Sequence, residues 1–222
     1  MTRHYQTILK DRATIEGYVD AVLRDGYVLL PDFFEPAYLT ELEQFAETNR
    51  SSDEGMKGMS LKSGDGTPMM RVARSEEFMD FFNAVYRARC AREGKEYRPL
   101  DPLRQWVGLP FKDATGGAKT KQTEFHYDGA YVNATVGIIE PPKGQGELHM
   151  FPNFRMKFPH PLLSKIASRF LRHSKALRSL YGYVSVPSKR NTLCLFFGDR
   201  SFHGVEPITE GKRMILTINN HW

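Results

Sequence analysis

Two histidines, one aspartate and one arginine stand at spacings that could build a metal site with an anion anchor. His126 and Asp128 lie two residues apart in the β-prone run from Phe125 to Gly129. Side chains at positions i and i+2 of a strand point to the same face, so this imidazole and this carboxylate can converge on one ion. The run therefore predicts two ligands of a metal site.

A third ligand is predicted in the segment from Phe197 to Pro207, which leaves a β-prone run and presents His203. Two imidazoles and one carboxylate form the facial set expected for non-haem Fe(II), because three ligands on one octahedral face leave three positions open for a bidentate 2-oxo acid and O2. Arg213 follows His203 by ten residues, at the start of another β-prone run. A buried Arg can pair a carboxylate through two hydrogen bonds, which suits the distal carboxylate of 2-oxoglutarate.

The residues around these motifs predict helices first and strands later. Apolar spacing predicts helices over about 14–24, 37–48 and 75–93, with Pro36 opening the second, Ser75 capping the third and Gly94 ending it. Strand-like runs cover 27–30, 104–109, 125–139, 147–151, 181–186, 192–197 and 213–219. This order predicts an α+β protein.

Length and composition predict one domain. The chain has 222 residues, of which 41% are hydrophobic and 12% aromatic, enough for one sizeable core. We expect a single domain over 1–222, with a mainly helical flank over 1–100 and a strand-rich core over 101–222. A further amphipathic, basic stretch predicts a helical insertion at about 157–180. The segment 50–67 has no sustained period and is expected to be a loop that could act as a lid.

Charge and cysteine content say less about function. The net charge of +5 comes largely from two basic clusters, which are typical of solvated helix faces. The clusters are Lys165, Arg169, Arg172, Lys175 and Arg178, and the run from Arg87 to Arg92. Cys90 and Cys194 stand on a predicted helix and a predicted strand, which favours reduced thiols. No run approaches the roughly 18 apolar residues of a membrane span. We expect a soluble, cytoplasmic protein.

The four site residues resemble those of the Fe(II)/2-oxoglutarate dioxygenases with a double-stranded β-helix (jelly-roll, cupin-like) core. The matching pattern is His126-x-Asp128, then His203 after 77 residues, then Arg213 after ten more. The segments 25–36 and 126–131 are similar to the phytanoyl-CoA hydroxylase-like branch. The resemblance implies N-terminal helices flanking the jelly roll. It also implies use of Fe(II), 2-oxoglutarate and O2, with ascorbate as a supporting reductant and succinate and CO2 as products.

The resemblance also suggests further contacts. Gln105 stands about twenty residues before the first metal histidine, where a Gln of related hydroxylases contacts 2-oxoglutarate. Ile215 departs from the family, which often has Ser or Thr there to support the same carboxylate. Thr217, the next residue on that strand face, is the expected substitute. Tyr131 and Asn133 continue the period of two and are expected to face the substrate cavity.

We therefore expect an enzyme that oxidises a C–H bond of a small-molecule or natural-product substrate, as a monomer or homodimer. The basic residues leave an anionic substrate open. Two other classes also stay open. A nucleic-acid or nucleotide demethylase would use the basic helix on phosphates and bind with steep salt dependence, although no aromatic residues interleave with that face and a nucleic-acid partner is not expected. A non-catalytic cupin-like protein would bind metal without turnover, and Arg213 argues against it.

Overall fold

The structure is a computed structural model that describes residues 12–48, 66–117, 120, 123–154, 170, 174, 176, 180 and 182–221. The helices are α2 (Arg12–Asp25), α3 (Pro36–Thr48), α4 (Pro68–Ala73), α5 (Glu76–Glu93) and the 3-10 turn η1 (Pro102–Arg104). The strands are β1 (Tyr27–Leu30), β2 (Gln105–Gly108), β3 (Phe111–Asp113), β4 (Thr123–His126), β5 (Val132–Ile139), β6 (Leu148–Phe151), β7 (Val184–Val186), β8 (Leu193–Phe196), β9 (Phe202–Val205) and β10 (Lys212–Asn220). The predicted insertion at 157–180 and loop at 50–67 lie almost wholly outside the described residues.

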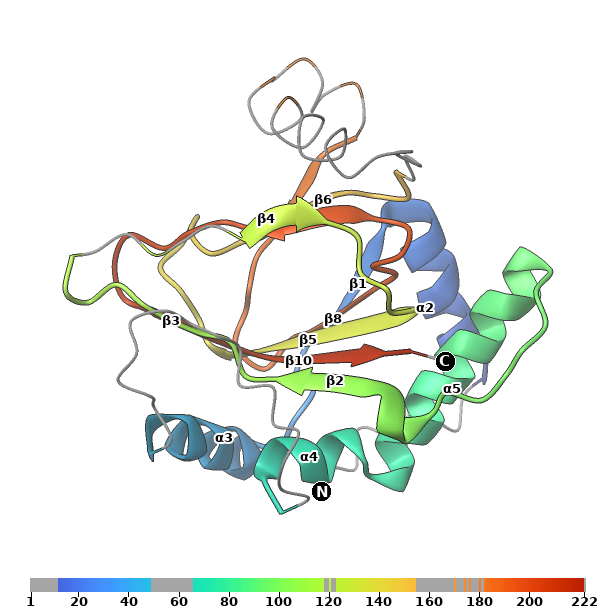
Figure 1. Ribbon diagram of the computed structural model, residues 1–222, viewed down its shortest axis with the longest axis horizontal. Helices are drawn as coiled ribbons and strands as arrows, with labels where there is room; N and C mark the ends of the chain where they lie inside the picture. Colours follow the sequence, from blue (N-terminus) through green and yellow to red (C-terminus); the bar gives the residue numbers. More distant parts are fainter. Residues whose placement is uncertain are drawn as a thin grey trace.

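Two antiparallel sheets face each other. The major sheet has the order β1-β8-β5-β10-β2, with β3 also paired to β10, and the minor sheet has the order β4-β9-β6-β7. In Figure 1 the minor sheet lies on one side of the major sheet, and α3, α4 and α5 lie on the other side. Helices on one face of antiparallel sheets confirm the predicted α+β class. Every helix within the described ranges is too short or too polar to cross a membrane.

Strand alternation gives the major sheet two different faces. On β5, Val132, Ala134, Val136 and Ile138 belong to the main hydrophobic core, which the helices complete. On β10, Met214, Leu216 and Ile218 join the same core. Since alternate residues point to opposite faces, the residues between them point toward the minor sheet. We call this the inner face of the major sheet.

A smaller apolar cluster packs between the two sheets. Leu148, Met150 and Val186 of the minor sheet pack on Cys194 and Phe196 of β8. This packing fixes the distance between the sheets and leaves polar side chains between them elsewhere. A third cluster, Phe125, Phe151 and Phe202, covers the outer face of the minor sheet.

Helix α5 begins and ends where the sequence predicts. The Ser75 hydroxyl accepts a hydrogen bond from the Phe78 amide at 3.3 Å, and Gly94 adopts the left-handed conformation at φ 63° that commonly ends a helix. The predicted strand at 27–30 is also confirmed, as β1. It pairs with β8, so the mainly helical flank contributes an edge strand to the major sheet.

Some predictions of local structure were wrong or incomplete. The run 125–139, predicted as one strand, is divided between β4 of the minor sheet and β5 of the major sheet. The chain passes from one sheet to the other around Gly129, so one period cannot continue through it. Helix α4 and strands β3 and β9 were not predicted, because each is six residues or shorter and carries a weak periodic signal.

One arginine of the basic run on α5 is buried, which corrects the prediction of a solvated face. Arg89 is 1% exposed, and its guanidinium donates to both carboxylate oxygens of Asp199 at 2.9 and 2.8 Å. It also donates to Glu93 at 3.1 Å and lies over the ring of Phe197 at 4.3 Å. Arg89 therefore connects α5 to the loop that follows β8.

Glu93 should make the stability of the protein depend on pH. Burial alone would raise the pKa of Glu93, but bonds and charges from Lys95, Arg89 and Arg200 lower it to about 2 from 4.5. A lowered pKa stabilises the fold at neutral pH, and this stabilisation is lost as the pH falls from about 4.5 to about 2. We expect Glu93→Gln to reduce the free energy of unfolding by about 1–3 kcal/mol at pH 7 and by much less below the lowered pKa.

Urea unfolding at neutral and acid pH would measure this difference. Glu96→Gln, a change of an exposed glutamate on the same segment, is the control and should alter stability little at either pH. An equal loss for Glu93→Gln at both pH values would contradict the expectation.

Candidate metal centre and anion pocket

His126, Asp128 and His203 come together on the inner side of the minor sheet. His126 ends β4 and is directly paired with His203 of β9, so both imidazoles leave the same face of the sheet. Asp128 follows β4, and its amide donates to the Gly198 carbonyl at 3.1 Å. The three side chains offer ligand atoms that all lie within 4.8 Å of one another. The grouping predicted from the sequence is therefore present.

Each oxygen of the Asp128 carboxylate faces one histidine. His126 Nε2 lies 3.3 Å from Oδ1, and His203 Nε2 lies 3.3 Å from Oδ2. Burial would raise the pKa of Asp128, but hydrogen bonds from the two histidines outweigh burial and hold the pKa well below its usual range. The carboxylate is thus in its anionic, ligating form. His203 Nδ1 meets the Ser201 carbonyl at 2.9 Å, so this ring nitrogen is turned away from the cluster and Nε2 is the ring nitrogen that faces Asp128.

This donor set fits a divalent transition metal. Two imidazole nitrogens and one carboxylate form a facial set that leaves other coordination positions open. Asp128 and His203 are largely buried, with side chains 16% and 5% exposed, whereas the side chain of His126 is 44% exposed. The cluster is therefore open to solvent on the side of His126.

Arg213 lies on the inner face of β10 and lines a pocket between the two sheets. The pocket is bounded by Leu148 and Val186 of the minor sheet and by Thr135 and Cys194 of the major sheet. Arg213 is 3% exposed, and its Nε has no hydrogen-bond partner among the residues that the structure describes. Burial lowers the pKa of Arg213 to about 10. A buried cation with an unused donor is the requirement for an anion site.

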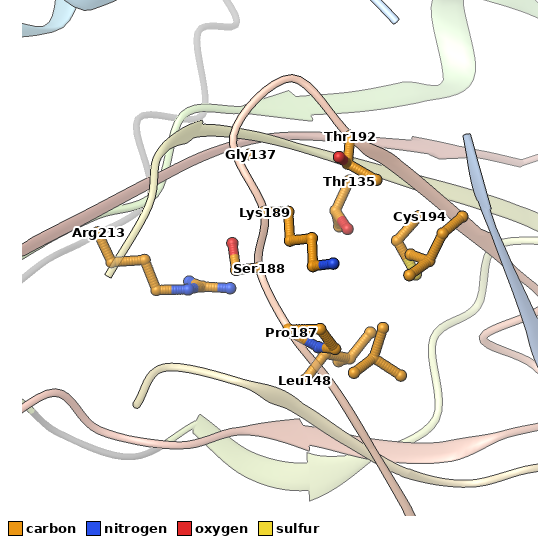
Figure 2. A pocket seen from close by; sticks show the side chains of 11 residues that line it. Thr135, Gly137, Leu148, Pro187, Ser188, Lys189, Thr192, Cys194 and Arg213 are labelled. Carbon is orange, nitrogen blue, oxygen red and sulfur yellow. The ribbon is translucent and has the colours of Figure 1, made fainter. Parts of the chain in front are cut away.

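Arg213, Ser188 and Lys189 all line the pocket, and Figure 2 shows the Arg213 guanidinium extending toward Ser188. A second buried cation stands on the next strand. Lys112 is paired with Arg213 across β3 and β10, and its Nζ donates to the Glu206 carbonyl at 3.2 Å. Burial and the charge of Arg213 lower the pKa of Lys112 to about 8. This end of the inner space is therefore electropositive.

Two glycines give the pocket its shape. A Cβ on Gly146 would lie 2.6 Å from Arg213 Cδ, so a glycine is needed beside the arginine side chain. A Cβ on Gly137 would lie 2.0 Å from the Lys189 carbonyl oxygen, so a glycine is also needed where the segment 187–190 crosses β5. That crossing brings Ser188 and Lys189 to the pocket.

The pocket offers hydroxyl groups other than the predicted one. Ile215 is buried, as expected for the position where related proteins often carry Ser or Thr. Thr217 does lie on the inner face, but it pairs with Thr135 and Gly108 and does not line the pocket. The hydroxyls that line it belong to Thr135, Ser188 and Thr192.

Gln105 and Tyr131 are not brought to this site. Gln105 Nε2 donates to Asn220 Oδ1 at 2.7 Å and contacts Met79 Sδ of α5 at 2.9 Å, which places it on the helix-covered face of β2. Tyr131 packs against the ring of Tyr86 on α5 at 5.5 Å. The physical reason is the alternation of side chains along a strand. When a strand is offset by one residue, or when it starts after a break, the residues expected on the inner face point to the helix-covered face.

Asn133 and Trp106 do lie on the inner face. Asn133 is fully buried and donates to Asp128 Oδ2 at 2.5 Å, so it contacts the candidate ligand and not an open cavity. Trp106 is paired across the sheet with Asn219, whose side-chain oxygen accepts a hydrogen bond from Asn133. The ring of Trp106 lies over Gly108. Sequence reasoning did not select Trp106 for the site, although the small residue two positions later, Gly108, is a signal that a large ring occupies that face.

No family model and no curated protein sequence matches this chain, whereas solved structures do. A prolyl 4-hydroxylase from Phytophthora capsici is similar with a TM-score of 0.64 and 16% identity, over 100% of this chain and 66% of that one. The non-haem α-ketoglutarate-dependent epimerase SnoN from nogalamycin biosynthesis is similar with a TM-score of 0.66 and 17% identity, over 95% of this chain and 82% of that one. The chain has the fold of these oxygenases. The predicted jelly-roll architecture is thereby confirmed.

A further structure of SnoN holds Fe3+, α-ketoglutarate and nogalamycin RO, and it matches this chain with a TM-score of 0.61 and 16% identity, over 95% of this chain and 84% of that one. A prolyl hydroxylase from Trichoplax adhaerens, solved with a peptide fragment, matches with a TM-score of 0.52 and 12% identity, over 97% of this chain and 92% of that one. The same fold thus serves proteins that take a natural product and proteins that take a peptide.

Proposed function

We propose that this chain is a non-haem Fe(II)- and 2-oxoglutarate-dependent oxygenase that oxidises a C–H bond of a small molecule. The observation that carries the proposal is the three-donor cluster of His126, Asp128 and His203 on the inner side of the minor sheet. The buried Arg213 in the pocket between the sheets supports it, because a dicarboxylate needs an anchor as well as a metal. The fold shared with SnoN supports it further.

The residues of the chain have separate tasks in this proposal. His126, Asp128 and His203 would hold Fe(II) on one face, and Arg213 would bind the distal carboxylate of 2-oxoglutarate and so orient its 2-oxo acid end. Fe(II) would supply the activation of O2, by which 2-oxoglutarate, O2 and a substrate C–H give succinate, CO2 and a C–OH. The apolar cluster between the sheets shares Leu148, Val186 and Cys194 with the lining of the Arg213 pocket and would help to exclude water from it.

Two finer points rest on the sequence resemblance. Membership of the phytanoyl-CoA hydroxylase-like branch rests on the segments 25–36 and 126–131. Oxygenation in place of halogenation rests on Asp128, since related halogenases have a small residue at this position. A small-molecule substrate is favoured by SnoN, whose structure holds nogalamycin RO.

Succinate formation tests the proposal. Purified protein with Fe(II), ascorbate, 2-oxoglutarate and a panel of candidate small molecules should convert 2-oxoglutarate to succinate, and the rate should rise with the true substrate. Omission of Fe(II) or O2 should stop it. Tight metal binding with no succinate from any condition would instead support the non-catalytic alternative. Turnover with an alkylated oligonucleotide alone, lost at high salt, would support the demethylase alternative.

A further inference from the structure

The loop between β8 and β9, residues Phe197 to Ser201, touches the candidate metal centre at several points. The Gly198 carbonyl accepts the Asp128 amide at 3.1 Å, and the Ser201 carbonyl meets His203 Nδ1 at 2.9 Å. Two of the three candidate ligands are thus held by the backbone of one loop. We call this segment the β8–β9 loop.

Asn133 connects the β8–β9 loop to the Asp128 carboxylate. Its Oδ1 accepts the Gly198 amide at 2.8 Å, and its Nδ2 donates to Asp128 Oδ2 at 2.5 Å and to Asn219 Oδ1 at 2.9 Å. The side chain is fully buried. An amide carries two N–H donors and a carbonyl oxygen on one rigid group, and Asn133 uses both donors and the oxygen here. The same oxygen that it contacts, Oδ2, is the one that faces His203.

The backbone of Gly198 packs closely against the side chains of Asn133 and Asp128. A Cβ there would lie 2.6 Å from Asn133 Oδ1 and 2.8 Å from both Cβ and Oδ2 of Asp128. Such distances are well below van der Waals contact, and the atoms concerned are short, buried side chains that cannot move aside cheaply. The carboxylate is therefore confined between Gly198 on one side and the histidines on the other.

Helix α5 fixes the β8–β9 loop from behind. Arg89 binds both oxygens of Asp199 and donates to the Tyr131 carbonyl at 2.5 Å, so it ties the loop to the start of β5. Arg200 of the loop donates to Glu93 of the same helix at 2.5 Å. Asn133 stands on β5, two residues beyond Tyr131. The loop and the asparagine are thus fixed to each other through a buried ion network.

We propose that Asn133 is a positioning residue for the metal centre: its amide, held by the β8–β9 loop, fixes the Asp128 carboxylate so that both histidines can share one ion with it. This inference rests on the proposed function only in that the cluster binds a metal. It assigns Asn133 a place behind the ligand, in contrast to the substrate contact predicted from the sequence. Partners of this kind orient a ligand and adjust its basicity.

Two variants remove this positioning in different ways. Asn133→Leu keeps the branching at Cγ and has no hydrogen-bonding atoms in its side chain. Gly198→Ala keeps Asn133 and displaces the carboxylate by contact. Asn83→Leu is the matched control, since Asn83 is also an amide with three hydrogen bonds, to Met79, Tyr97 and Leu100, but it lies on α5 away from the cluster. Gly17→Ala controls for the added methyl, because no atom of the described residues lies within 4 Å of a Cβ there.

The measurement is titration of the metal-free proteins with Co(II), followed by its visible absorption, together with thermal unfolding of each metal-free variant. Asn133→Leu and Gly198→Ala should each weaken Co(II) binding by about 10- to 100-fold and change the shape of the absorption band. Asn83→Leu should lower the unfolding temperature and leave Co(II) affinity and spectrum as in the wild type. Gly17→Ala should alter neither.

Wild-type Co(II) affinity and spectrum in Asn133→Leu would overturn the inference even if its stability falls. Should Asn133→Leu not fold, Gly198→Ala decides, and unchanged Co(II) binding in it would overturn the inference equally. A wild-type protein that binds no Co(II) and forms no succinate would instead overturn the proposed function. A wild-type protein that forms succinate while both variants bind Co(II) normally would overturn the positioning role alone.

Discussion

Replacement of His203 by Ala is expected to abolish Fe(II)-dependent conversion of 2-oxoglutarate to succinate. The side chain is 5% exposed and supplies one of three donors to the cluster, so its loss leaves a two-ligand site with a cavity behind it. The rate should fall by at least about 100-fold, because changes one shell further from a metal already cost 10- to 100-fold. His126→Ala should have the same result. The measurement is succinate formed per unit time at saturating Fe(II) and 2-oxoglutarate.

His149→Ala is the control for this prediction. His149 lies on β6, opposite Gly204 of the strand that carries His203, but it points to the outer face, where its Nε2 lies 3.1 Å from Glu206. It is a buried histidine of the same sheet without a place in the cluster. Its removal should lower stability and leave turnover per folded molecule nearly unchanged. Full turnover in His203→Ala would remove this residue from the site.

Replacement of Arg213 by Ala is expected to raise the 2-oxoglutarate concentration needed for half-maximal turnover by about 30-fold or more. Loss of one partner from a buried, charge-assisted pair costs about 2–5 kcal/mol. The maximal rate should fall less than the affinity, since Arg213 would act on binding and orientation. Initial rates over a wide range of 2-oxoglutarate concentration would separate the two effects.

Lys212→Ala offers a matched control, because it removes one positive charge from the neighbouring residue of the same strand. Lys212 is half-buried and does not line the pocket. An equal rise in the 2-oxoglutarate requirement for both variants would mean that net charge, and not the pocket, sets the affinity. An unchanged requirement in Arg213→Ala would exclude it from cosubstrate binding.

Spacing and periodicity predicted the cluster because its residues are close in sequence to regular strands. His126 and Asp128 needed only the alternation of one strand, and His203 and Arg213 stand on the consecutive strands β9 and β10, one in each sheet. The same spacing argument does not bring Gln105 to the cluster, because its side chain lies with Met79 and Asn220 on the helix-covered face of β2. Its distance from His126 predicts that Gln105 is on a strand, but it does not determine which face of the sheet Gln105 occupies. Trp106, one residue later, faces the inner space instead.

Other features of the site depend on contacts that no single stretch of sequence contains. Arg89 and Asp199 are 110 residues apart in sequence and meet only because α5 packs behind β5. Asn133 was expected on the inner face, where it lies, but its partner was not foreseeable. The turn after Asp128 brings the carboxylate back onto the asparagine, and that turn interrupts the period on which the prediction relied.

The two-sided major sheet has a consequence for how this protein can change. On β5 and β10, residues of one parity complete the helix-covered core, and residues of the other parity line the inner space. A saturation mutagenesis scan of these strands should therefore alternate: poor expression at 132, 134, 136, 214, 216 and 218, and well-expressed but altered proteins at 135, 215 and 217. Substitutions at the inward-facing residues of β5 and β10 could then change substrate preference, while the residues between them keep the core and the fold unchanged.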